Sequence, residues 1–461
     1  MGKVIDSKYT FLTTAPVSRV VAVMSVPTVI SMLTTSIYNL IDTYFVSGLG
    51  TNATVAVGLS FTFITLLQAI GFFLGHGTGN YIAIKLGTKN IEEAQRMVNV
   101  GITYAVILGI IILTIGTIFL KDITAFLGAS SEVQPKTEIY LQWLILSAPF
   151  MISSLMLNLQ VRMQGLAKYA MIGIVSGMVV NLILDPIFIF TFGLGIEGAG
   201  IATFVGQFIS CGILLIILAR SEVTPKVKVA SSMRYIREII NGGSPSFMRQ
   251  GLGCISILLL NLYASHFGES AVAAMTVTTR ITFIALSVIT GLGQGFQPLC
   301  GFCYGAGLYG RIHKAFRFTV LVGTAILGCF MIVGLLFIVD ILSLFSSNSD
   351  VVEFGTRALR YQLIVFPIEA FVIIASIFLQ TINRTTEANI MVTSRKGLFF
   401  IPLICLLPNI FGFQGVLLCQ PICDVCAFIL AIPLISKTFS VLNQKNGRYK
   451  FCLLYTSPSP R

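Results

Sequence analysis

Charged residues are scarce in this sequence of 461 residues: Asp, Glu, Lys and Arg together make up only 10% of it. A soluble domain carries roughly 25% charged residues, because its surface must be hydrated. Hydrophobic residues make up 55%, which is more apolar surface than a soluble core of this length needs. The scarcity of charge therefore excludes an ordinary soluble protein and indicates a chain whose main solvent is lipid.

Motifs of nucleotide and zinc chemistry are also missing. The sequence has no GxxxxGK[ST] loop, whose backbone N–H groups would hold nucleotide phosphates. Its three histidines, His76, His266 and His313, lie far apart and form no HExxH zinc motif. We therefore expect neither an ATP-driven motor nor a metalloenzyme, and no cofactor.

Long apolar stretches are abundant, and twelve of them reach the roughly 20 residues that a helix needs to cross a bilayer. This number predicts an all-α membrane protein of twelve transmembrane helices. The stretches lie at 18–46, 54–84, 97–120, 138–161, 169–192, 196–219, 239–266, 271–304, 318–345, 358–383, 389–411 and 416–436.

The basic residues, which give a net charge of +12, predict the orientation of these helices. If the N-terminus is cytoplasmic, 24 of the 30 basic residues fall on the cytoplasmic side. The outer segments then hold only Lys121, Lys136, Arg357 and Arg360. Cytoplasmic loops of membrane proteins carry such an excess of Lys and Arg. We therefore expect a multi-pass protein of the cell membrane with both termini in the cytoplasm, and we expect no binding to nucleic acid.

The two halves of the sequence repeat each other at a shift of 218 positions. Without a gap over some 120 residues, Gly, Pro and other landmarks coincide. The pairs include Pro27 with Pro245, Gly50 with Gly268, Gly75 with Gly293, Gly77 with Gly295, Gly87 with Gly305, Asp122 with Asp340, Ser131 with Ser349 and Pro149 with Pro367. Each half holds six spans, so both halves enter the membrane from the same side, as in a parallel repeat.

The repeat predicts two six-helix lobes, at 1–219 and 243–440. The linker at 220–242 is the longest polar stretch, so we expect it to act as the hinge, with a short amphipathic helix in its later half. A C-terminal tail follows at 441–461. Its last residues, LLYTSPSPR, resemble translated sequencing-adapter sequence, so we expect the end of this tail to be artefactual.

Two acidic residues within apolar spans are the main candidates for function. Each costs about 2.5–3.5 kcal/mol at the bilayer centre, so it needs a physical reason. Asp42 follows Asn39 by three residues, and Asp185 follows Asn181 by four, so each acid shares a helix face with an amide. Two carboxylates and two amides would form an oxygen-rich pocket that suits Na⁺ or a shared proton.

Prolines within the spans predict bends in the helices. Pro186 lacks an N–H, which leaves the carbonyl of Leu182 free beside Asp185. Pro27 and Pro245 occupy equivalent positions in the two halves and are expected to let the first helix of each half bend.

Glu369 and Asp424 are further acids within apolar spans, and we regard them as additional coupling candidates together with Asn39. The alternative is structural, because an arginine in a nearby span would neutralise them. Arg249, Arg280 and Arg395 are the candidates for that neutralising partner.

Several stretches resemble the multidrug and toxic compound extrusion (MATE) family. They are PTVIS and YNLIDTYFVSGLG in the first span, NLILDPIFIF in the fifth, GIEGAGIATFVGQ in the sixth, and the glycine-rich ends of the second and eighth. The resemblance covers residues 15–440 and is greatest to the bacterial branch of multidrug export and DNA-damage-inducible proteins. It implies an antiporter that exports amphipathic, often cationic compounds in exchange for H⁺ or Na⁺ by alternating access between two lobes.

The resemblance also implies a cation site, formed by Asp42, Asn181, Asp185 and Thr203. Some relatives carry a further acid on the seventh helix. This sequence has Arg249 there instead, and Glu369 is a partial substitute at most.

Contacts to the exported compound are harder to predict, because an apolar interface that repacks around many ligands has no fixed motif. Tyr38 and Asn158 are candidates to line it. A monomer is sufficient for this architecture.

Two alternative functions remain open at this point. A lipid-linked oligosaccharide flippase of a related fold would line its cavity with several basic residues for phosphate, and only Arg249, Arg280 and Arg395 are available. An intramembrane aspartyl enzyme would use Asp42 and Asp185 for hydrolysis, which the transporter-like repeat disfavours.

Overall fold

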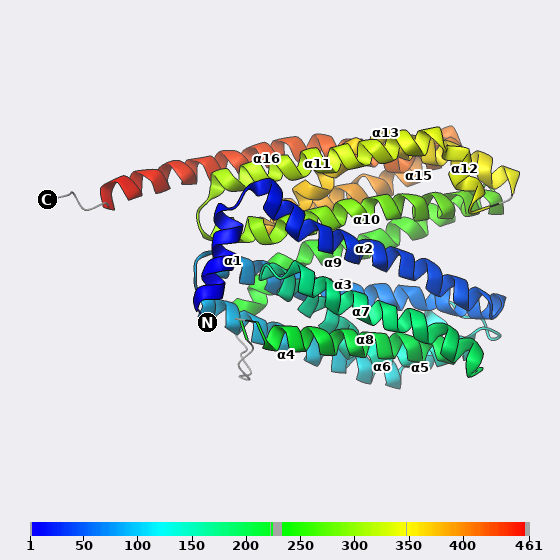
Figure 1. The fold of residues 1–461 in the computed structure, drawn as a ribbon. Coiled ribbons are helices and arrows are strands. Elements are labelled where there is room, and N and C mark those ends of the chain that lie inside the picture. The colour runs from blue at the N-terminus through cyan, green and yellow to red at the C-terminus, as the bar shows by residue number, and fades with distance from the viewer. Residues whose placement is uncertain (1, 222, 225–232, 347, 457–461) are drawn as a thin grey trace. The chain divides into compact units, whose positions relative to one another are not determined.

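The computed structural model describes residues 2–456 apart from 222, 225–232 and 347, and it leaves the side chains of 2–7, 39–40, 42–43 and 446–456 undescribed. Every regular element among the described residues is a helix (Figure 1). Within this described part of the chain, twelve helices or joined helices are long and apolar enough to cross a membrane, which confirms the predicted all-α fold.

The first half of the chain forms a surface helix and six spans. The short helix α5 lies in one of the connections between these spans. The bounds are α1 Gly2–Thr14, α2 Val17–Ser47, α3 Thr51–Gly87, α4 Ile91–Ile118, α5 Leu120–Phe126, α6 Gln134–Met163, α7 Ala167–Pro186 with the π-helix η1 Ile187–Thr191, and α8 Ile196–Ala219.

The second half repeats this order of long and short helices. Its bounds are α9 Met233–Ser265, α10 Glu269–Gly305, α11 Tyr309–Leu336, α12 Ile338–Ser343, α13 Ser349–Thr381, α14 Thr385–Thr393 with the π-helix η2 Ser394–Leu398, α15 Phe400–Phe411 and α16 Phe413–Thr456. The fifth span of each half therefore contains a π-helix, which ends the span in the first half and lies inside it in the second.

The last helix of each half starts in the same way. Gly195 precedes α8 with φ 56°, and Gly412 precedes α16 with φ 58°, a left-handed conformation that favours glycine. Gly198, three residues after Gly195, has no room for a side chain. A Cβ atom there would lie 2.7 Å from the Phe188 carbonyl carbon of the preceding span. The equivalent Gly415 is equally close to α15.

Hydroxyl side chains donate hydrogen bonds to backbone carbonyl oxygens of their own helices, which lets them lie in an apolar environment. Ser60 donates a hydrogen bond to the Ala56 carbonyl oxygen, and Thr278 donates one to Ala274, each four residues back. Many Ser and Thr residues in the spans are therefore compatible with membrane burial without any functional role.

The described chain forms two compact units, and the division crosses three of the helices. One unit comprises 1–26, 83–89 and 255–461, and the other comprises 27–82 and 90–254. In the first unit, a Cβ atom at Gly295 of α10 would lie 2.3 Å from the Ser25 Cα atom of α2. In the other, a Cβ atom at Gly77 of α3 would lie 2.5 Å from the Ile239 carbonyl oxygen of α9. Repeat-related glycines thus allow the first part of α2 and of α9 to pack closely against α10 and α3. The predicted lobe boundaries remain a prediction.

Two local expectations need correction, and the structure adds a helical conformation for most of the C-terminal tail. The ninth span was expected at 318–345 but is α11 at Tyr309–Leu336. The basic residues in the first turns of α11 lower its hydropathy there, so the expected start was too late. The later half of the linker is not a separate helix but the first turns of α9. The tail after residue 440 continues α16 as far as Thr456 (Figure 1); residues 457–461 lie outside the described residues.

Candidate functional site

Three of the predicted site residues lie together on α7 and α8, which pack side by side. Asn181 and Asp185 of α7 are 3% and 0% exposed, and Thr203 of α8 is also buried. Asn181 Nδ2 donates a hydrogen bond to Thr203 Oγ1 over 3.4 Å. Asp185 lies one helical turn beyond Asn181, on the same face of α7.

A pair of glycines allows this close approach of the two helices. A Cβ atom at Gly177 would lie 2.5 Å from the Gly206 carbonyl oxygen, and a Cβ atom at Gly206 would lie 2.8 Å from the Gly177 carbonyl oxygen. Real Cβ atoms are not found this close to backbone atoms. Glycine at both positions therefore brings Asn181 within reach of Thr203.

Helix α2 runs alongside α7 and η1 in the same compact unit. Thr35 Oγ1 lies 3.7 Å from the Met178 sulfur atom. Further along both helices, the rings of Phe45 and Phe190 meet edge to face, with 6.4 Å between their centroids. The two contacts follow in the same order along both helices, so the helices run in the same direction.

This alignment places position 42 at the level of Asp185. Asp42 follows Thr35 by seven residues, and Asp185 follows Met178 by seven residues. The distance along the helix axis from the Thr35–Met178 contact to the acid is therefore the same in both helices. The side chains of Asn39 and Asp42 lie outside the described residues. Their helix is beside the buried cluster, and their participation in it remains a prediction.

The helix changes its geometry directly after Asp185. α7 ends at Pro186, and residues 187–191 form a π-helix, in which Phe192 donates its backbone hydrogen bond to the Ile187 carbonyl oxygen. Pro186 cannot donate a backbone hydrogen bond, so the regular α-helical ladder is interrupted here. Single π-turns inside helices frequently occur at functional sites.

The chemistry of this cluster is that of oxygen atoms around a buried carboxylate. Asn181 Oδ1 is buried and accepts no hydrogen bond from any described residue. A carboxylate in a low-dielectric environment needs a cation, a proton or several donors, because an isolated charge costs many kcal/mol there. The carboxylate of Asp185, the amide oxygen of Asn181 and the hydroxyl of Thr203 thus suit a small hard cation or a proton.

The second half of the chain contains a different polar cluster, which is built on an arginine. Arg395 of η2 lies between two buried acids, with its Nη2 2.8 Å from Glu369 Oε1 of α13. Its Nε lies 2.5 Å from Asp424 Oδ1 of α16. Of the three arginines proposed to neutralise these acids, Arg395 is the one that does so. Arg280 is exposed and Arg249 is half-buried.

Two residues of this cluster were not predicted from the sequence. Gln420 Nε2 donates to both carboxylate oxygens of Asp424, over 3.0 and 3.1 Å. Lys396 Nζ donates to Gln420 Oε1 over 3.1 Å. The topology count places Arg395 and Lys396 on the cytoplasmic side, but both lie within the eleventh span, at 385–411. The sequence did contain a signal for Lys396, since a pair of basic residues ten positions inside an apolar span indicates buried acceptors.

The two residues proposed to line a substrate path differ in their surroundings. Asn158 of α6 is buried, and its Nδ2 donates to the Ala170 carbonyl oxygen of α7 over 2.8 Å, which links these two helices. Tyr38 of α2 is half-buried. Their contact with an exported compound remains a prediction.

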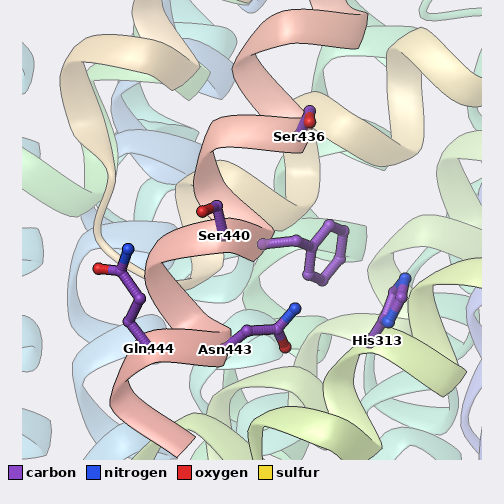
Figure 2. A pocket seen from close by; sticks show the side chains of 6 residues that line it. His313, Ser436, Ser440, Asn443 and Gln444 are labelled. Atoms are coloured by element: carbon purple, nitrogen blue, oxygen red, sulfur yellow. The ribbon is translucent and has the colours of Figure 1, made fainter. Parts of the chain in front are cut away.

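A polar cleft between α11 and α16 is a third feature (Figure 2). The rings of His313 and Phe439 meet there with 4.5 Å between their centroids, and Ser436, Ser440 and Asn443 contribute polar atoms. Ser436 follows Asp424 by twelve residues, so it lies about 18 Å further along α16. The lining contains no acid that could hold a cation. Nor do any three His, Cys, Asp or Glu side chains of the described residues gather as a metal site.

Comparison with known proteins matches both halves to one family. The model of the MatE family matches residues 27–187 and 245–406, two segments whose starts lie 218 positions apart, the offset of the internal repeat. The multidrug export protein MepA of Staphylococcus aureus (strain MSSA476) is 27% identical over 434 residues, which cover 92% of this chain and 96% of that protein. MepA of Staphylococcus saprophyticus is 26% identical over 419 residues and covers 88% of this chain and 91% of that protein.

Among solved structures, the outward-facing conformation of a multidrug resistance MATE family transporter of the MOP superfamily is similar. Its TM-score is 0.89 and its sequence identity 25%, and the similarity covers 94% of this chain and 98% of that chain. The fold and the order of helices are therefore shared along nearly the whole length of the sequence.

Proposed function

Because this chain belongs to the MatE family and is a multidrug efflux transporter, we propose that it exports amphipathic and cationic compounds by antiport against H⁺ or Na⁺. The observation that supports the antiport is the buried cluster of Asp185, Asn181 and Thr203, which offers oxygen atoms to a cation or a proton. The sequence contains no GxxxxGK[ST] loop for ATP, and we propose an ion gradient as the source of energy.

The coupled ion is proposed to bind at Asp42, Asn181, Asp185 and Thr203, with Asn39 as an additional ligand. When an ion or proton enters from outside, it neutralises the carboxylates and so changes the cost of burying them. The membrane potential contributes about 2.3 kcal/mol per charge for each 100 mV, which is enough to drive export against a gradient.

Alternating access is proposed to use the first helix of each half. The boundary between the two compact units falls between Val26 and Pro27 in α2, and between Cys254 and Ile255 in α9, nine residues after Pro245. Proline lacks one backbone hydrogen bond, so a helix bends more easily beside it. We propose that these two prolines, with Pro186 beside the ion site, permit the bending that accompanies transport.

The remaining features of the proposal follow from the family and the charge pattern. Both termini are proposed to be cytoplasmic, the protein is proposed to act as a monomer, and Tyr38 and Asn158 are proposed to lie on the substrate path. Arg395 was a candidate phosphate ligand for the flippase alternative. It is already bound to two carboxylates, which argues against that alternative. Glu369 and Asp424, the additional coupling candidates from the sequence, both bind this arginine.

The test is efflux of ethidium from energised cells that express the wild type, Asp42→Asn or Asp185→Asn at equal levels. We expect both variants to lose export by at least tenfold, and we expect removal of Na⁺ or addition of a protonophore to identify the ion. Asp122→Asn is the matched control, because Asp122 lies in the short outer helix α5 rather than in a span. Normal export by both Asp42→Asn and Asp185→Asn would contradict the proposed ion site.

A further inference from the structure

The arginine cluster of the second half joins three spans through one guanidinium. Arg395 binds Glu369 of α13 through Nη2 and Asp424 of α16 through Nε, over 2.8 and 2.5 Å. The side chain of Glu369 is 4% exposed and that of Asp424 is 1% exposed. The two nitrogens belong to one rigid planar group, so Arg395 fixes both acids at once.

The backbone holds Arg395 in this position. It lies in the π-helix η2, where Phe399 donates its backbone hydrogen bond to the Ser394 carbonyl oxygen, five residues back. The wider turn leaves the Lys396 carbonyl oxygen to accept a hydrogen bond from Ser256 Oγ of α9 over 2.7 Å. The segment that carries the guanidinium is therefore anchored to a fourth helix.

The two polar clusters lie partly on equivalent helices, because α16 corresponds to α8 and the span that contains η2 corresponds to α7, whereas Glu369 lies on α13, whose counterpart is α6. At the offset of 217 that relates Gly198 to Gly415, Thr203 of the first-half cluster corresponds to Gln420 of the second. The first-half cluster brings a carboxylate, an amide and a hydroxyl together. The second-half cluster brings two carboxylates and an amide together, and adds a guanidinium to them.

The charges of the second cluster already balance. Glu369 and Asp424 are the two acids, and Arg395 and Lys396 are the two basic residues. A transported cation added to this set would leave an unbalanced positive charge in the span, where uncompensated charge is expensive. The cluster has no electrostatic need for an ion from solution.

From this geometry we propose that Arg395 is a resident cation, whose guanidinium occupies the position in the second half that a transported ion would otherwise take. Glu369 and Asp424 then bind no transported ion, and each transport cycle draws its coupling from the first-half site alone. This inference rests on the proposed antiport. It adds that an arginine excludes a second coupled ion.

A small cavity beside Arg395 makes the proposal testable by chemical rescue. It has a volume of about 60 Å³, enough for one or two waters, and Glu369, Arg395, Lys396 and Gln362 line it. Glu369 Oε2 lies in its wall, buried and without a donor among the described residues. Truncation of Arg395 would enlarge this cavity into a vacancy of the right shape and charge for free guanidinium.

The first experiment compares wild type and Arg395→Ala in proteoliposomes, with about 5 mM guanidinium on both sides or with none. We expect Arg395→Ala to export ethidium at least tenfold more slowly, and guanidinium to restore at least half of the lost rate. Sodium or tetramethylammonium at the same concentration is expected to restore nothing, and wild type in guanidinium controls for competition with the substrate. Rescue by sodium instead of guanidinium, or full export by Arg395→Ala without any addition, would overturn the proposal.

If Arg395→Ala does not fold, a variant without charges in the cluster tests whether Glu369 and Asp424 couple transport. Glu369→Gln, Asp424→Asn, Arg395→Gln and Lys396→Gln are combined, so that none of the four charges of the cluster remains in the span. We expect this variant to export with the same dependence on Na⁺ or on a protonophore as the wild type. Export that no longer depends on the ion would show that the two acids couple transport and that Arg395 is no resident cation. Absence of export by the wild type would count against the proposed function instead.

Discussion

Replacing Gly206 by alanine is expected to force α8 away from α7 and to weaken the ion site that these helices share. A Cβ atom at residue 206 would lie 2.8 Å from the Gly177 carbonyl oxygen and 3.0 Å from Asn181 Cβ. Neither neighbour can rotate aside, because one is a backbone atom and the other is fixed to the backbone. Overpacking of this kind costs about 1–3 kcal/mol. The hydrogen bond from Asn181 to Thr203, already 3.4 Å long, would lengthen as the helices move apart.

The same helix supplies a matched control for this substitution. A Cβ atom at Gly212 would meet no other atom within 4 Å. Alanine is favoured over glycine in a helix by about 1 kcal/mol, so Gly212→Ala is expected to leave stability unchanged or slightly raised. Both variants would be unfolded in detergent and assayed for ethidium export at matched expression. Wild-type stability together with wild-type export in Gly206→Ala would refute the packing argument.

Three further predictions concern other contacts of the described residues. Thr203→Val removes the hydroxyl that accepts from Asn181 and is expected to lower the apparent affinity for the coupled ion by about tenfold, with recovery in Thr203→Ser; export measured against pH and Na⁺ concentration tests this. Gly295→Ala would place Cβ 2.3 Å from Ser25 Cα and is expected to destabilise the protein by about 1–3 kcal/mol, whereas Gly310→Ala meets nothing within 4 Å; unfolding of both variants compares them. Arg395→Leu leaves two buried carboxylates unpaired and is expected to cost about 3–5 kcal/mol, of which Arg395→Lys recovers part; equal stability of wild type and Arg395→Leu would contradict the ion network.

The sequence predicts those features of the fold that depend on the solvent and on local pattern. Twelve spans follow from hydropathy, because lipid demands an apolar helix of fixed length. The repeat is visible because glycine and proline mark backbone geometry that no other residue provides, as at Gly195 and Gly412. Asn181 and Asp185 can be placed on one face of a helix from their spacing alone.

The remaining features depend on contacts between distant parts of the chain. Sequence spacing could not show that Arg395 and Lys396 are half-buried and hydrogen-bonded within a span, because their acceptors Glu369, Asp424 and Gln420 lie on two other helices. The division of α2 and α9 between the compact units is equally invisible in the sequence, since it depends on which helices each part packs against. Helix α1 was missed because Gly2–Thr14 has no long apolar stretch.

Coupling of export to an ion at the first-half site can be measured directly as ion movement driven by substrate. Wild type and Asp185→Asn would be placed in proteoliposomes with an ethidium gradient and no ion gradient, and movement of H⁺ and of Na⁺ would be followed separately. We expect wild type to move one of these ions against the flow of ethidium, and Asp185→Asn to move neither. Ion movement of equal size in Asp185→Asn, or ethidium transport by wild type without movement of either ion, would contradict it.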